Sequence, residues 1–169
     1  MRRFLFFFVA ACNVSLSSVG FDIPYDIPTQ TVPGNQTANA AGVAVDVPLM
    51  PIPVNINLAQ EEQQNGVSGV ITTVTLTSLS FSITGSGCFD FVQSISLSIE
   101  STNASSSLAP AVIATGANPG CVQTFSLSTS NVNLQPYLDE GAQIAPTVSG
   151  VPPASDVTFD GQLVAHASL

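Results

Sequence analysis

Three cysteines, one histidine and eleven carboxylates are the side chains of this 169-residue chain that could be acylated, cross-linked, bind metal or catalyse a reaction. The first cysteine, Cys12, follows Val9-Ala10-Ala11, and this tetrapeptide has the pattern at which bacterial lipoprotein precursors are cut before a cysteine that is then acylated. Arg2 and Arg3 precede an apolar run over residues 4–11, as a secretory signal requires. We therefore expect residues 1–11 to be a lipoprotein signal peptide and Cys12 to carry the lipid.

The apolar run is too short to cross a bilayer, which needs about 20 helical residues. A plain secretory signal and a buried N-terminal strand remain as alternatives for this segment. Asn13, and not Asp, follows the cysteine, which favours the outer membrane of a Gram-negative bacterium. The expected location is the cell envelope, with the membrane as a partner through Cys12.

The other two cysteines, Cys88 and Cys121, are an even pair in a chain expected to enter an oxidising compartment, so a disulfide is the simplest prediction. Each cysteine follows a glycine-containing loop segment, and closing about 34 residues of chain would stabilise the fold by roughly 3–4 kcal/mol. A redox-active pair is not indicated, because the Cys-x-x-Cys spacing is missing.

Catalytic and metal-binding patterns are weak. His166 and Asp160 share one face of a predicted strand, but six residues of strand put them roughly 20 Å apart, so we expect His166 to be a solvated surface residue. Asp90, Asp139 and Glu140 are weak calcium candidates if loops bring them to one end of the fold. No cofactor is indicated, and we expect the protein not to be an enzyme.

The charge distribution excludes whole classes of function. Both arginines lie in the predicted signal, so the mature chain has no Lys or Arg against its eleven carboxylates. Binding to nucleic acid depends on such residues to neutralise phosphates and is therefore excluded. Lysine nucleophiles are excluded for the same reason. The expected partner is an unknown protein or glycan of the envelope.

Two regions follow the predicted signal. Residues 12–44 are rich in Pro, Gly and Asn and predict a flexible tether, with a short duplication, Phe21-Asp22-Ile23-Pro24 and Tyr25-Asp26-Ile27-Pro28. This segment is either an extended arm along the folded domain or a docking motif for a partner. Residues 45–169 alternate apolar and polar residues and predict a single antiparallel β-sandwich, immunoglobulin-like or jelly-roll-like.

Short strands account for most of this domain. One helical turn is expected at 61–66 and another at 134–141, the second crossing between the sheets. We expect the prolines at 48, 51 and 53 to lie at a sheet edge. The predicted strands cover 45–47, 54–58, 74–84, 91–99, 111–114, 122–128, 143–148 and 156–169.

Two of these strands carry more detailed predictions. In 74–84 the apolar positions change from even to odd across Thr77-Ser78, which predicts a β-bulge or a change of partner there. In the last strand, Val157, Phe159, Leu163, Ala165 and Ala167 form one face. Asp160, Gln162 and His166 form the other, which we expect to be solvated.

The chain resembles a family of small uncharacterised lipoproteins from Gram-negative bacteria. The resemblance implies an envelope location and a single β domain, and it carries no activity or site residue. Such relatives are expected to bear basic residues, which this mature chain lacks, so its partners differ. The segments that carry the resemblance are Phe21–Pro24, Gln30–Gly34, Pro51–Ile56, Val74–Leu79, Cys88–Ile95, Ile99–Thr102 and Pro153–Gly161.

The functional expectation is a lipid-anchored structural or interaction module. One alternative is a carrier of an apolar ligand between the sheets, with Phe81, Phe89, Phe91, Phe125 and Phe159 lining a cavity in place of a solid core. Another alternative is a calcium-dependent adhesion module.

Overall fold

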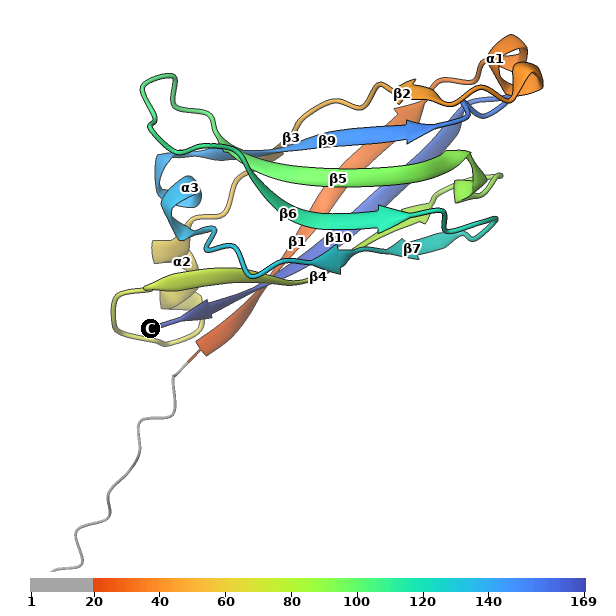
Figure 1. Ribbon diagram of the computed structural model, residues 1–169. Helices are drawn as coiled ribbons and strands as arrows, with labels where there is room; N and C mark the ends of the chain where they lie inside the picture. Colours follow the sequence, from red (N-terminus) through yellow and green to blue (C-terminus); the bar gives the residue numbers. More distant parts are fainter. Residues whose placement is uncertain (1–19) are drawn as a thin grey trace, which may run out of the picture.

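A computed structural model describes residues 20–169, whose strands form two antiparallel sheets packed face to face (Figure 1). The predicted all-β sandwich is therefore confirmed. The predicted signal and Cys12 lie outside the described residues. Within residues 20–169, no helix is long and apolar enough to span a membrane.

Sheet A has the strand order β1-β10-β4-β7, and sheet B has the order β2-β9-β5-β6-β8, with β3 also paired to β9. The strands of sheet A are β1 (Gly20–Val32), β4 (Thr73–Ile83), β7 (Thr124–Ser126) and β10 (Val157–Ser168). Those of sheet B are β2 (Val45–Val47), β3 (Ile52–Val54), β5 (Val92–Ser101), β6 (Ala111–Ala117), β8 (Ser128–Thr129) and β9 (Ala142–Gly150). The helices are α1 (Gln36–Ala41), α2 (Leu58–Gln64), α3 (Gln135–Glu140) and the 3₁₀ turn η1 (Phe89–Phe91).

The first strand corrects the predicted tether. Residues 20–32 are not flexible linker: they form the edge strand β1, which pairs with β10 along most of its length. The duplicated tetrapeptide has a period of two, so Phe21, Ile23 and Ile27 face the core while the Asp and Pro residues between them face solvent. Proline is compatible with this position because an edge strand needs only half of its backbone donors. The β domain therefore includes residues 20–32 and does not begin at residue 45.

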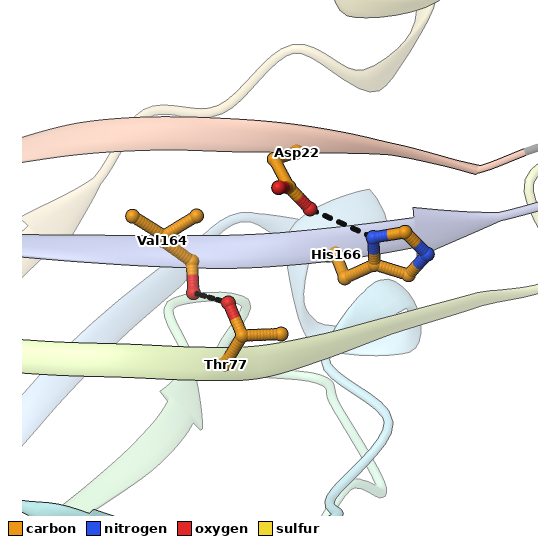
Figure 2. A network of polar contacts seen from close by, with 4 residues as sticks. All are labelled: Asp22, Thr77, Val164 and His166. Atoms are coloured by element: carbon orange, nitrogen blue, oxygen red, sulfur yellow. Dashed lines mark hydrogen bonds and ion pairs between the residues drawn. The ribbon is translucent and has the colours of Figure 1, made fainter.

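The predicted bulge in β4 is confirmed. Ser78 pairs with Val164 of β10 and Leu76 pairs with Ala165, so Thr77 is the extra residue. Its Oγ1 donates a 2.9 Å hydrogen bond to the Val164 carbonyl oxygen, as Figure 2 shows. The bulge lets Val74 and Leu76 on one side and Leu79 and Phe81 on the other all reach the core, although their sequence phase differs.

Most other predicted elements are confirmed, with three differences. The strand predicted over 54–58 is wrong, because the strand there is Ile52–Val54. Asn57 instead caps α2, and its side chain accepts a hydrogen bond from the Gln60 backbone N–H. The segment 122–128 divides into β7 and β8, since the chain passes from sheet A to sheet B at Leu127. Helix α1 lies inside the predicted tether, between an Asn35 cap and the left-handed Gly42.

Candidate functional site

The outward face of sheet A is rich in polar side chains and is called here the sheet A face. Its residues come from alternate positions of four strands, so the inward neighbours form the core while these side chains reach solvent. It holds three carboxylates, whereas the residues of β5 in sheet B that are not buried are one glutamine, one glutamate and serines. Its polar side chains include Asp22, Asp26, Thr75, Ser80, Ser82, Thr124, Ser126, Asp160, Gln162 and His166.

Cross-strand register places these side chains in rows. His166 lies opposite Asp22 on β1 and opposite Thr75 on β4. The His166 Nδ1 is 2.7 Å from the Asp22 Oδ1, and the two side chains are 39% and 67% exposed (Figure 2). The imidazole also lies against Gly20, where a Cβ atom would meet the His166 Nε2. The pair fastens the first residues of β1 to β10.

This pairing changes one sequence expectation. His166 is surface-exposed as predicted, but its carboxylate partner is Asp22 and not Asp160. Sequence reasoning missed Asp22 because it lay in the predicted tether, and only the β1–β10 register brings the two residues together. Within the described residues, no serine or cysteine nucleophile is hydrogen-bonded to His166, so the arrangement does not form a catalytic triad.

A polar groove occupies the other end of the sheet A face. It has a volume of about 530 Å³ and opens between Asp26 of β1 and Asp160 of β10. Gln162 lies opposite Asp26, and its Nε2 is 3.3 Å from the Asp26 Oδ1. Asp160 is diagonal to Asp26, which corresponds to about 7–8 Å between backbone positions. The groove lining comprises Asp26, Ile27, Pro28, Thr29, Ser80, Ser82, Asp160, Gly161 and Gln162.

The groove is built from ordered strands and a backbone irregularity. The register between β1 and β10 shifts between Ile27 and Gln30, so Pro28 and Thr29 bulge out of the ladder and form one wall. Two carboxylates, hydroxyls and one amide give it mainly hydrogen-bond acceptors. Such a surface suits a partner that supplies donors, either ammonium and guanidinium groups or sugar hydroxyls.

The disulfide between Cys88 and Cys121 is present, with the two Cα atoms 5.0 Å apart. Cys88 lies between β4 of sheet A and β5 of sheet B, while Cys121 lies between β6 of sheet B and β7 of sheet A. The bond therefore ties together two connections that cross between the sheets. Beside it, the Phe89 N–H donates to the Val122 carbonyl at 3.0 Å.

The calcium candidates do not come together. Asp90 lies in η1, two residues before the start of β5, whereas the Glu140 Oε2 accepts a 2.8 Å hydrogen bond from the Ser101 Oγ at the end of that strand. The ten residues of β5 span about 30 Å, so Asp90 lies at the opposite end of the sandwich from Asp139 and Glu140. In the part of the chain that the structure describes, no three His, Cys, Asp or Glu side chains form a metal-binding group.

Glu140 has a structural environment instead. Hydrogen bonds from Ser106 and Ser101 lower the pKa of its carboxyl below the ordinary value of 4.5. These two hydrogen bonds link the end of β5 and the loop after it to the end of α3.

The phenylalanine cluster is packed solid. Phe89 is 3% exposed, and its ring centroid lies 6.0 Å from Phe91, 6.0 Å from Phe125 and 5.9 Å from Phe159. The cavity that these rings line measures about 20 Å³, far below the several hundred Å³ of a ligand pocket. Within residues 20–169, the space among these rings is therefore too small to hold the apolar ligand of the carrier alternative.

Exposed apolar side chains lie at both ends of the sandwich. Val43 and Met50 flank β2, and Val45 is its first residue. An open groove of about 280 Å³ runs there between β2 and the end of β1. Among the large apolar residues of 20–169, Val70 in the loop before β4 is the most exposed, at 78%.

The fold and its polar face define a two-sheet antiparallel β-sandwich with an acidic surface. No protein-family model matches the chain, and no curated protein matches it. Among solved structures, the chain is similar to a chain in the cryo-EM structure of Mud crab tombus-like virus, with 11% sequence identity, 90% of each chain covered and a TM-score of 0.29. A likeness this distant carries no argument about function.

Proposed function

We propose that this chain is a lipid-anchored lipoprotein of the cell envelope, held at Cys12 in the outer membrane of a Gram-negative bacterium. It acts as a non-enzymatic interaction module and presents the sheet A face to a protein or glycan of the envelope. The observation that carries this proposal is the groove between Asp26 and Asp160, built on three neighbouring strands of a chain whose mature part has no Lys or Arg.

Electrostatics supports a partner rich in hydrogen-bond donors. Within the described residues, the sheet A face has three carboxylates and a single histidine that already contacts one of them. Complementary charge raises the association rate and suppresses partners of like charge. Because the groove is open to solvent, salt would screen this attraction strongly.

Binding measurements on groove variants test the proposal. The Asp26→Asn/Asp160→Asn double variant removes two charges and keeps the side-chain size. The matched control, Asp46→Asn/Asp90→Asn, removes two charges from exposed positions outside the groove. Both are compared with the wild type for retention of purified envelope proteins and envelope glycans, at low and at physiological salt.

We expect the groove variant to lose at least tenfold in affinity for one retained species and the control to lose less than twofold. Equal losses in the two variants would show that only net charge matters. Unchanged binding by the groove variant would place the partner site elsewhere on the molecule.

A further inference from the structure

One uncharged loop lies at the end of the sandwich where β1 starts. Residues 66–72, between α2 and β4, contain no charged side chain. Val70 is 78% exposed there, while Ile71 beside it is buried at 6% and fixes the loop to the core. Gly69 packs against Leu169, since a Cβ at this glycine would be 3.2 Å from the leucine side chain. The loop is therefore held in place while Val70 faces solvent.

Strand register places this loop close to the start of β1. The Thr72 N–H donates to the Ser168 carbonyl at 2.9 Å, and Thr73 pairs with Ser168, which in turn pairs with Gly20. Two strand spacings separate Thr73 from Gly20, or about 10 Å. Figure 1 shows the start of β1, the end of β10 and α2 at one end of the sandwich, with α1 at the other.

The distance to the lipid is limited by the chain. Seven residues lie between Cys12 and Gly20, and the eight residue-to-residue steps that join them span at most about 28 Å when fully extended. An acylated Cys12 therefore keeps this end of the sandwich within reach of the bilayer, where the tether gives even a weak contact a high effective concentration.

We propose that the loop 66–72 is a second membrane contact, with Val70 entering the lipid headgroup region. The inference rests on the proposed lipid anchor. Carboxylates lie close to the loop, since Asp22 is on β1 and Glu61 and Glu62 are on α2. They repel anionic lipid, so the surface that the loop fits is zwitterionic. Contact at this loop fixes the orientation of the domain and turns the α1 end away from the membrane.

The chain contains no tryptophan, so one substitution provides a depth probe. The Val70→Trp variant is compared with Val43→Trp, which places the same probe at a 58% exposed valine beside α1, at the opposite end. The mature chain is coupled through the Cys12 thiol to a maleimide lipid in phosphatidylcholine vesicles, with Cys88 and Cys121 protected in their disulfide. Bromine on the acyl chains quenches only a tryptophan that reaches the membrane.

We expect brominated vesicles to lower the fluorescence of Val70→Trp at least twofold and to leave that of Val43→Trp unchanged. Vesicles of anionic lipid should reduce the quenching. No quenching of Val70→Trp, or equal quenching of both variants, would overturn the inference. Ser68→Trp probes the same loop if Val70→Trp does not fold.

The two proposals fail in different ways. A native chain without acyl groups overturns the proposed anchor and this inference with it. An acylated native chain whose loop probe is not quenched overturns the loop contact alone.

Discussion

Removal of the disulfide is the perturbation whose magnitude follows most directly from the structure. Cys88 and Cys121 are 33 residues apart, and the chain-entropy model gives about 4 kcal/mol of stabilisation for a loop of about this length. The bond joins two crossings between sheets A and B, so its loss also frees both connections at that end. For a domain of this size, about 4 kcal/mol corresponds to a decrease in Tm of about 8–16 °C.

The assay is thermal unfolding of the mature chain by circular dichroism. The Cys88→Ala/Cys121→Ala variant and the wild type are each measured with and without a thiol reductant. We expect reductant to lower the Tm of the wild type to near that of the variant and to leave the variant unchanged. A wild type whose Tm does not move, although mass spectrometry shows it to be reduced, would refute this account of the bond.

Three further substitutions test the core, the bulge and the carboxyl at α3. Phe89→Ala should lower the free energy of unfolding, measured in urea, by about 3–5 kcal/mol, because this ring is buried among three others. A decrease below about 1 kcal/mol would contradict a solid core. Thr77→Val should lower the free energy of unfolding by only about 1 kcal/mol, since it removes one exposed hydrogen bond to the Val164 carbonyl. The bulge should remain, so a changed register between β4 and β10, seen by NMR, would contradict this prediction. Since the pKa of Glu140 is lowered in the folded state, its stabilisation is present above the ordinary value of 4.5 and is lost as the pH falls through the lowered pKa. The difference in Tm between the wild type and Glu140→Gln should therefore shrink in acid, and a constant difference would be inconsistent with this role.

Sequence periodicity predicted the second half of the fold well. The phase change at Thr77 identified the bulge, because side chains alternate strictly in a strand and only an extra residue lets both phases face one core. The two faces of β10 were predicted correctly for the same reason. The cysteine pair was predicted from its even number and expected compartment, with no need for the topology.

Composition misled the prediction for the first strand. The prolines in the duplicated tetrapeptide indicated a flexible linker, whereas the period of two in Phe21, Ile23, Tyr25 and Ile27 indicated a strand. A strand at the edge of a sheet can have this period of two and still contain prolines. Which strand lies at the edge is defined only once the sheet is assembled. The His166–Asp22 pair and the groove beside Asp26 depend on that strand, so sequence reasoning could not find them.

The intact mass of the chain extracted from native membranes tests the central claim, a lipid-anchored and oxidised envelope domain. The account predicts a mature chain that begins at Cys12 and carries acyl groups on it. The mass should rise by two hydrogens when reductant opens the Cys88–Cys121 bond. A chain that retains residues 1–11 without acylation would contradict the anchor, and with it the proposed role at the membrane.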